Sequence, residues 1–437
     1  MTRTWILFGS IVLVTIAVLA LLVNIFRRQQ EARITYRHVV EIPANEPDPA
    51  VWGANFPNEY DSYQRTLKTS TFAQYSKYGR YGGSENFSKL HKYPNITRLF
   101  AGYPFSVEYR EERGHLHAVA DMLATKRLGD KKPGPCMTCK SSQVPGIMAQ
   151  IGPEQFYRTP VKQLVSKFDI KHSISCADCH QSGTMALQVT RPAFREAMER
   201  RKTPVPTANH QQMRAYVCGQ CHVEYYWPKE TNYLTFPWDR GMRLEQIEEY
   251  YDRMGFSDWT HAETGAKLVK MQHPDYELWS SGIHARAGVS CPDCHMPFKR
   301  EGSIKVTDHW IATPLADVAR ACTTCHRASE AEMRARVLEI QDRTYSLLSR
   351  AEEALIAAID GIKLAIAAGA TDAELEEPRR LHRRAHLRWD FISAENSMGF
   401  HSGGEANRIL GDAIDFARQA ELAAYKVMAA RQGGTRR

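Results

Sequence analysis

Five short cysteine pairs constrain this chain more than any other feature of its sequence. Each pair has the form C-x-x-C, and together the pairs use all ten cysteines. Four pairs are followed directly by histidine and the fifth by lysine. The five motifs are Cys136/Cys139/Lys140, Cys176/Cys179/His180, Cys218/Cys221/His222, Cys291/Cys294/His295 and Cys322/Cys325/His326. C-x-x-C-H is the attachment sequence of a c-type haem, in which two thiols bond to the porphyrin and the histidine binds iron.

Zinc sites and disulfides are the alternatives, because C-x-x-C pairs also bind zinc and ten cysteines could fill two such sites. The histidines favour haem, since histidine makes up only 17 of 437 residues and yet follows four of the five pairs. We therefore expect five covalently bound haem c groups. In the first motif Lys140 would bind iron through an amine, and a haem that differs from its neighbours is where we expect substrate chemistry.

An apolar segment stands at the N-terminus. Residues 4–26 include no charged side chain, and this stretch is long enough for a helix to cross about 30 Å of hydrocarbon. It exceeds the apolar region of a typical cleaved signal peptide. We expect residues 1–28 to be an uncleaved membrane anchor, with a cleaved signal as the alternative.

The orientation of this segment follows from the haem motifs. Arg27 and Arg28 favour a cytoplasmic C-terminal side by the positive-inside rule, but long domains translocate largely regardless of charge. Haem c is attached outside the cytoplasm. We therefore expect the body on the periplasmic side of the bacterial inner membrane, or soluble in the periplasm if the segment is cleaved.

The rest of the chain divides by composition. Residues 29–60 are polar and proline-bearing and predict a tether, and residues 61–326 hold all five motifs in one haem-packed body. The expected fold is mainly α: a multihaem cytochrome c body of short helices and loops with few strands, followed by long helices in residues 327–437. Helices are predicted over 329–368, from about Pro378 to Ser397, and from about Gly404 to before Gly433.

The long helices are expected to pack as a bundle or to dimerise. The apolar stripe Leu348, Ala351, Leu355, Ile359 and Ile362 has helical spacing, which predicts a core more than an interface. The formal charge of +8 suits an anionic small substrate or an acidic partner. No basic run with interleaved aromatic residues suggests nucleic acid.

The whole pattern resembles the pentahaem cytochrome c nitrite reductases, the ammonia-forming enzymes. The likeness covers about residues 85–430. Beyond the haem motifs it rests on the segments Arg113-Gly114-His115, Val223-Glu224-Tyr225-Tyr226, Lys270-Met271-Gln272-His273-Pro274, Gly282-Ile283-His284 and Thr307-Asp308-His309. The membrane segment is the main departure, because many members of the family have a cleaved signal. The resemblance implies six-electron reduction of nitrite to ammonium in respiratory nitrite ammonification.

The resemblance also nominates residues around the lysine haem. Arg113 would hold the anion, His273 would bond substrate oxygens and relay protons, and Tyr225 would donate a hydrogen bond or a proton. Each residue also has an ordinary structural interpretation. The arginine would pair with a carboxylate, the histidine would be a structural residue with satisfied hydrogen bonds, and the tyrosine would only contribute packing. A calcium ion beside this haem would be bound by Glu224 and Gln272 and by the backbones of Tyr225 and Lys270.

The other four haems need a second histidine each. The resemblance selects His91, His284, His309 and His401 as distal ligands, and their pairing with individual haems stays open. His115 and His117 are candidates for hydrogen bonding near the active haem. We expect His38, His210, His382 and His386 on the surface.

Two other functions compete with nitrite reduction. A non-catalytic electron conduit would need every iron capped on both sides, which the lysine motif disfavours. A related reductase acting on hydroxylamine or sulfite would use the same site, so both compounds are candidate side substrates. The expected electron donor is a separate membrane-bound quinol-oxidising multihaem cytochrome, and the expected assembly is a homodimer.

Overall fold

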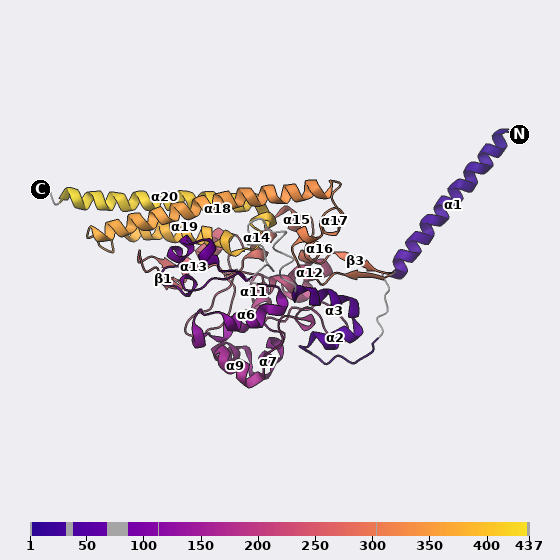
Figure 1. Ribbon diagram of the computed structural model, residues 1–437, viewed down its shortest axis with the longest axis horizontal. Coiled ribbons are helices and arrows are strands. Elements are labelled where there is room, and N and C mark those ends of the chain that lie inside the picture. Colours follow the sequence, from indigo (N-terminus) through magenta and orange to yellow (C-terminus); the bar gives the residue numbers. More distant parts are fainter. Residues whose placement is uncertain (1, 32–37, 68–85, 112, 303, 435–437) are drawn as a thin grey trace.

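Three parts of the chain differ in their secondary structure: an isolated N-terminal helix, a body of short helices, and three long C-terminal helices (Figure 1). The computed structural model describes residues 2–31, 38–67, 86–111, 113–302 and 304–434. The predicted fold, mainly α with few strands, is confirmed.

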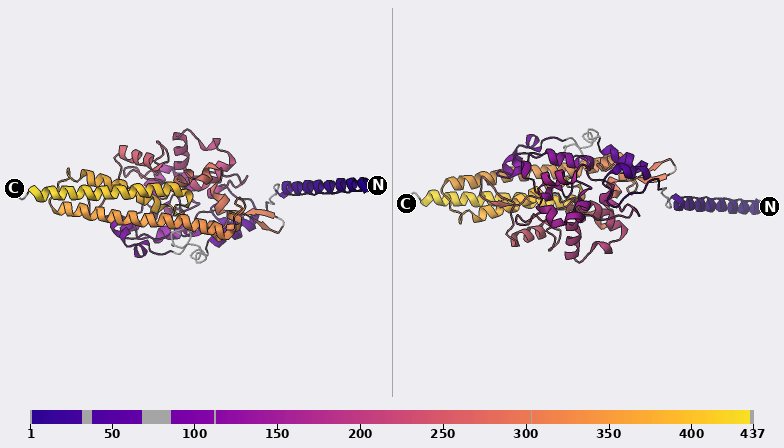
Figure 2. Two further views of the ribbon diagram at one scale, coloured as in Figure 1. Left: turned by 90° about the horizontal axis from the view of Figure 1, so that it is seen from above. Right: turned by 90° about the horizontal axis from the view of Figure 1, so that it is seen from below.

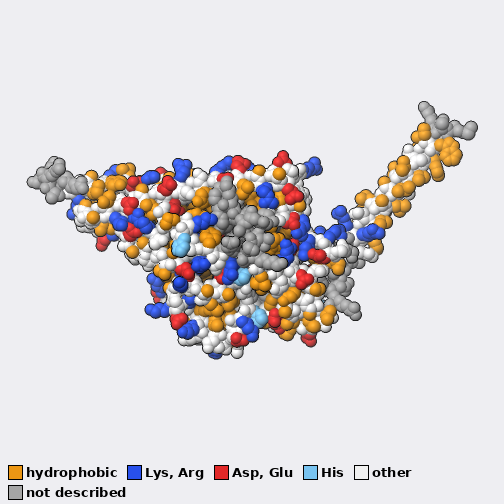
Figure 3. Space-filling view, viewed as in Figure 1, with side chains coloured by type: hydrophobic (Ala, Val, Ile, Leu, Met, Phe, Trp, Pro, Cys, Tyr) orange, Lys and Arg blue, Asp and Glu red, His pale blue; other side chains and the backbone are white. Residues whose placement is uncertain are grey.

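The N-terminal helix α1 (Thr2–Glu31) projects away from the body (Figures 1 and 2). Its large apolar side chains are exposed, and they form a continuous apolar surface in Figure 3. The stretch Thr4–Gln30 is long and apolar enough to cross a membrane. Such a helix in a folded chain fits either a membrane anchor or a signal sequence.

Short helices make up the body. They are α2 (Pro49–Asn55), α3 (Pro57–Gln64), α4 (Lys89–Lys92), α5 (Asn95–Leu99), α6 (Ala118–Ala124), α7 (Val144–Ile151), α8 (Pro153–Arg158), α9 (Val161–Phe168), α10 (Cys176–Cys179), α11 (Pro192–Arg200), α12 (His210–Gly219), α13 (Leu244–Arg253), α14 (Asp275–Ser280), α15 (Ile283–Arg286), α16 (Cys291–His295) and α17 (Val318–Ala321). Many begin with proline in the first turn, as in α2, α3, α8 and α11. Proline suits that position but cannot extend a helix, which keeps the elements short.

Two small antiparallel hairpins complete the body. Strand β1 (Trp259–Thr260) pairs with β2 (Lys267–Leu268), and β3 (Phe298–Glu301) pairs with β4 (Ile304–Thr307). The second hairpin precedes His309, so its register fixes where that histidine enters the body.

An aromatic core and one buried ion pair hold the first two cysteine motifs together. Met137, inside the first motif, is fully buried in a cluster with Phe156, Phe194 and Trp238. The guanidinium of the buried Arg191 donates to the carbonyls of Thr138 (2.7 Å) and Ser141 (3.1 Å) and pairs with Asp178 (2.7 Å). Asp178 lies within the second motif, so Arg191 fixes the two motifs relative to each other.

The C-terminal helices are α18 (Glu330–Ala367), α19 (Glu376–Ala394) and α20 (Gly403–Gly434). Ser329 and Glu332 form a capping box at the start of α18, and Gly369 follows its end at a φ of 82°. All members of the predicted apolar stripe are buried, which confirms it as core. Helices α18 and α20 lie side by side along the bundle (Figure 2).

The expectation that His382 and His386 lie on the surface is wrong, whereas His38 and His210 are exposed. Both of the buried histidines are on α19 and are spaced four residues apart, about one helical turn. Leu381 and Trp389 of the same helix are buried as well. The ring of His382 lies 5.1 Å from that of His261 in the body. These rings are part of the contact between the body and the bundle.

Candidate haem centres and active site

Local helix geometry presents each cysteine motif. The second and fourth motifs form the one-turn helices α10 and α16, each started by a serine and an aspartate in a capping box. The third motif begins with Cys218 in the last turn of α12, and the first begins with Cys136 in a 3₁₀ turn, Gly134–Met137. A single turn is enough to place two cysteines and the next residue around one attached group.

The fifth motif is more exposed than the other four. Cys325 is exposed, whereas each of the other nine cysteines is partly covered by the protein. His326 is exposed as well. The physical reason is the position of the motif: it forms the connection between α17 and α18, where the chain leaves the body at its surface. The predicted attachment role of Cys325 therefore stays a prediction, and the side chains of this chain do not enclose its thiol.

The cysteines do not form the alternative sites. All ten are unpaired as thiols. Among the described residues, which include every cysteine, the two groups of three or more side chains close enough to hold a metal ion contain only histidine, aspartate and glutamate. Zinc sites need thiolates or imidazoles converging on one point, and this arrangement offers none with sulfur.

Histidine rings face each other across the positions that the motifs imply for iron. Two imidazoles on opposite sides of one metal have ring centres roughly 6 Å apart, because each metal–nitrogen bond is about 2 Å long. The centres are 6.4 Å apart for His180 and His309. The same distance is 6.3 Å for His326 and His284 and 6.3 Å for His295 and His401. These residues therefore fit haem groups with two axial histidines.

A cavity of about 660 Å³ lies beside two of these distal histidines. Its wall includes His284, His401, Phe391 and Ile409. A space of this volume, lined by both apolar and polar side chains, suits a bound prosthetic group.

The third motif faces His115, which was predicted only to form hydrogen bonds near the active haem. The ring of His115 lies 6.1 Å from the ring of His222. Desolvation, followed by the charges of His222 and Lys140, lowers the pKa of His115 to about 3, which keeps the imidazole neutral as a metal ligand must be. His91 is instead exposed on α4, and its backbone N–H donates to Ser88.

Positive charge gathers at the lysine motif. Burial raises the pKa of the Cys136 thiol to about 11, and Arg127, Lys132 and Lys140 act in the opposite direction because their charges lie close to the sulfur. The second thiol, Cys139, senses the charges of Lys140 and His273. This surrounding favours an anion at the first motif.

Arg113 and Arg127 differ in their partners. Arg113 lies outside this group of charges: its guanidinium bonds to Asp121 through Nε at 3.0 Å and through a second nitrogen. Arg127 stacks on the ring of Phe105 at 4.0 Å, and no described carboxylate forms an ion pair with it. An arginine without a carboxylate partner keeps its five donors for an anion.

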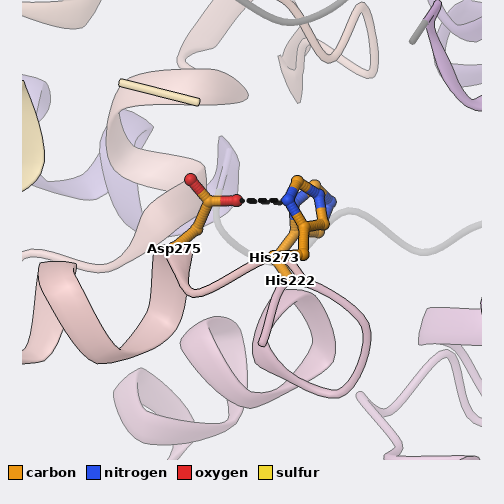
Figure 4. Close-up of side chains that lie close together, drawn as sticks. All are labelled: His222, His273 and Asp275. Atoms are coloured by element: carbon orange, nitrogen blue, oxygen red, sulfur yellow. Dashed lines mark ion pairs between the residues drawn. The ribbon is translucent and has the colours of Figure 1, made fainter. Parts of the chain in front are cut away.

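His273 and Tyr225 come from two loops beside the first motif. His273 precedes α14, and its Nδ1 lies 3.0 Å from Oδ2 of Asp275 (Figure 4). The ring of His273 lies 4.5 Å from that of His222, and Asn396 Nδ2 lies 3.3 Å from its Nδ1 and 3.5 Å from its Nε2. Tyr225 is half-buried and stacks on Trp227.

Three of the residues nominated for calcium, Glu224, Lys270 and Gln272, are joined by hydrogen bonds. The fully buried Glu224 accepts hydrogen bonds from the Tyr251 hydroxyl (2.8 Å) and the Gln272 backbone N–H (2.6 Å). The Gln272 side chain donates to the Lys270 carbonyl at 3.1 Å. Burial raises the pKa of Glu224 well above its usual value, so a cation would stabilise the ionised carboxylate. Oxygen donors of this mixed type suit calcium.

Sequence reasoning missed Arg127 and Asp275, and it gave His115 only a supporting role. Arg127 stands nine residues before Cys136 with Lys131 and Lys132 between them, and this basic run is a signal that could have favoured it. The sequence held no comparable signal for Asp275, because its contacts join residues that are far apart along the chain.

Comparison with known proteins gives the same architecture. The family model described as Cytochrome c552 matches residues 48–436. The chain is 41% identical to cytochrome c-552 of Bacteroides fragilis over 433 residues, covering 97% of this chain and 86% of the relative. It is 35% identical to cytochrome c-552 of Maridesulfovibrio salexigens over 446 residues, covering 98% of this chain and 85% of the relative.

A solved structure agrees as well. It is the catalytic subunit of cytochrome c nitrite reductase from Desulfovibrio desulfuricans, described as having two calcium sites. It superposes with a TM-score of 0.81 at 31% identity and covers 89% of this chain and 88% of its own. The cysteine motifs, the facing histidines and these matches show that the chain belongs to the cytochrome c552 family.

Proposed function

We propose that this chain is an ammonia-forming nitrite reductase with five covalent haem c groups. One observation carries the proposal: four motifs have a second histidine ring facing them, whereas the lysine motif is surrounded by Arg127, His273 and other positive groups. A protein that only conducts electrons would need two axial ligands at every haem, so one motif without a facing histidine favours an enzyme. The matching catalytic subunit from D. desulfuricans supports the same assignment.

Each residue at the first motif then has a role. A haem attached at the first motif would supply electrons for nitrite reduction, and Lys140 would hold its iron through an amine. Arg127 holds the anion and stabilises the charge that develops on its oxygens. His273 bonds a substrate oxygen and delivers protons near neutral pH. Tyr225 supplies a further hydroxyl donor.

The activity is tested with the purified holoprotein and a reduced viologen dye as electron donor. We expect one ammonium per nitrite consumed. Hydroxylamine and sulfite measured in the same way rank the side substrates. Release of nitric oxide without ammonium, or no nitrite consumption by fully haem-loaded protein, would overturn the proposal.

Arg127 takes the anion-binding role that the resemblance gave to Arg113. Losing a charge-assisted hydrogen bond costs about 1.5–3 kcal/mol, so Arg127→Ala should lower kcat/KM for nitrite by about tenfold to a hundredfold. Arg113→Ala is the matched control and should leave kcat/KM within about twofold. The reverse ranking would return the role to Arg113.

The axial ligands are proposed in the same way. His309, His115, His401 and His284 are the distal partners of the second to fifth motifs, so His115 replaces His91 in this set. A pyridine haemochrome assay should give five haems per chain, including the one bonded to the exposed Cys325. His115→Ala should create a new high-spin haem, and His91→Ala should not.

One calcium ion is proposed at Glu224, Tyr225, Lys270 and Gln272. Elemental analysis should find calcium in the native protein and its loss in Glu224→Gln. Glu263→Gln, which removes a carboxylate from another part of the body, should keep it. Full calcium content in Glu224→Gln would move the ion elsewhere.

Membrane anchoring by α1 is proposed together with the donor. Ile42 is buried against Ala177 of the second haem motif. Ten residues lie between Glu31 and Ile42, so the motif can be no further than about 40 Å from the end of α1. This distance supports delivery of electrons to the second haem by a membrane-bound, quinol-oxidising multihaem cytochrome on the periplasmic side.

Mass spectrometry of the native protein tests the anchor, since the intact mass must include residues 4–26. A mature start near residues 20–30 would make the segment a cleaved signal. A homodimer through the long helices is proposed because Leu364, Leu422 and Tyr425 of α18 and α20 are exposed. Light scattering of the detergent-solubilised protein measures the assembly, and a monomer would refute it.

A further inference from the structure

Five of the histidines assigned to haems fall into two groups by the partner of their Nδ1 nitrogen. The Nδ1 atoms of His180, His295 and His309 each lie 2.9 Å from a backbone carbonyl, those of Met185, Ala312 and Thr307 respectively. The Nδ1 atoms of His222 and His401 face carboxylates instead. His222 lies 3.5 Å from Asp275, and His401 lies 3.5 Å from Glu395.

Asp275 has further contacts in the same place. Its Oδ2 lies within 3.0 Å of His273 Nδ1 and 3.5 Å of His222 Nδ1 (Figure 4). Its Oδ1 accepts the backbone N–H of Asn396 at 2.8 Å and lies 3.7 Å from His401 Nδ1. The carboxylate is buried. One anion therefore faces histidines of the catalytic site and of two neighbouring haem sites.

We propose that Asp275 is a positioning residue that sets the donor strength of His222 and the orientation of His273. This inference rests on the proposed function, because it needs a haem at the third motif and substrate at the first. A carboxylate that accepts the outward N–H of an axial histidine fixes its tautomer and raises its basicity. A more basic ligand stabilises ferric iron, so the haem of His222 has a lower reduction potential than a haem whose histidines face only carbonyls.

The same oxygen lies 3.0 Å from Nδ1 of His273 and would hold that ring in one orientation. With Nδ1 facing Asp275, Nε2 is the nitrogen that can face substrate. The two effects are linked, because one oxygen serves both rings. The haem that neighbours the active haem is then a stronger reductant, and the proton-donating histidine is held ready beside it.

Potentiometry with optical and EPR detection tests this without nitrite, so its result does not depend on the proposed activity. In the unmodified protein, the His222 haem should titrate at a lower potential than the haem of His180 and His309. The His222 haem is identified by magnetic coupling to the lysine haem, since Cys221 and Cys139 lie against each other. Equal potentials, or the reverse order, would overturn the proposal.

Variants of Asp275 distinguish a specific contact with His222 from a general effect of losing one negative charge. Asp275→Asn should raise the potential of the His222 haem, change its EPR g values, and lower kcat for nitrite by about tenfold to a hundredfold with a smaller change in KM. Asp275→Glu keeps the charge and should restore most of the low potential. Asp239→Asn is the control, because Asp239 lies in none of the five motifs and pairs with Arg200, and it should leave the His222 haem unchanged.

Two results would show that Asp275 is only structural. The first is an unchanged His222 haem: in Asp275→Asn with all haems attached, its reduction potential and g values equal those of the unmodified protein. The other is an identical shift in Asp275→Asn and Asp275→Glu. If Asp275→Asn does not load its haems, the order of potentials in the unmodified protein decides the question.

Discussion

The body and the C-terminal bundle achieve their stability in different ways. Helices α18, α19 and α20 bury a regular apolar stripe against one another, so side chains alone provide their core. The body has helices of ten residues or fewer, joined by loops, and Cys294, His284 and His401 of its proposed haem sites border cavities. We expect attached groups to fill those spaces. The core of the bundle, which the body residues Phe100 and Trp259 also join, is complete without cofactors, whereas the body depends on them.

The largest test of this comparison removes the haems. Chain produced in the cytoplasm, without haem attachment, should leave the body unfolded, because the attached groups that would fill its cavities are missing. Limited proteolysis should then digest residues 38–326 quickly and α18–α20 slowly. Equal resistance of the two parts would mean that the body folds on its own side chains.

A second test compares the four motifs that end in histidine with the one that ends in lysine, and asks whether the lysine is needed for activity. Lys140→His should keep five haems but lose most nitrite turnover, because the identity of the axial ligand is a main control on haem reactivity. The haem count by pyridine haemochrome and the rate of ammonium formation are both needed. Full loading with unchanged turnover would remove the lysine from the mechanism.

A third change should affect the bundle alone. Leu355→Ala on α18 removes a fully buried side chain and should lower the free energy of unfolding by about 2–5 kcal/mol. Chemical denaturation followed by circular dichroism measures this loss. The haem potentials should stay unchanged, and a shift in them would show that the two parts are more tightly coupled than their packing indicates.

The smallest expected effect lies where the parts meet. Glu263 of the body bonds to Arg98 (2.9 Å) and to Lys363 of α18, and the Arg98 hydrogen bond does most to lower the pKa of Glu263 to about 2 from 4.5. A lowered pKa adds stability that is present above the unfolded value of 4.5 and is lost as pH falls toward 2. Acid titration of the unfolding midpoint should show this loss, and Glu263→Gln should remove that part of the pH dependence.

The sequence was enough to predict what repeats locally and not what depends on distant contacts. The apolar stripe and the ends of α18 follow from spacing and from capping residues, and the structure agrees with each. Burial of His382 and His386 was missed, although their four-residue spacing matches the buried face of α19. The facing of His115 and His222, more than a hundred residues apart, depends on how loops fold together, which no local pattern reveals.

Exposure of Cys325 was hidden from the sequence for a similar reason. The five motifs look alike as short patterns, so nothing in the fifth one indicates that it lies at the surface. Its exposure is set by the neighbouring elements, because α18 leads the chain away from the body soon after this motif. Spacing predicts the residue types that attach a haem, whereas the cover over each thiol depends on tertiary packing.

The short connection between α1 and the second haem motif has a kinetic consequence. With α1 in a bilayer, the ten residues between Glu31 and Ile42 would confine the enzyme to a thin layer next to the membrane surface. Tethers of this length correspond to effective concentrations of the order of millimolar. A donor in the same membrane would then meet this haem by lateral diffusion in two dimensions, and electron delivery would no longer depend on the amount of enzyme in the surrounding solution.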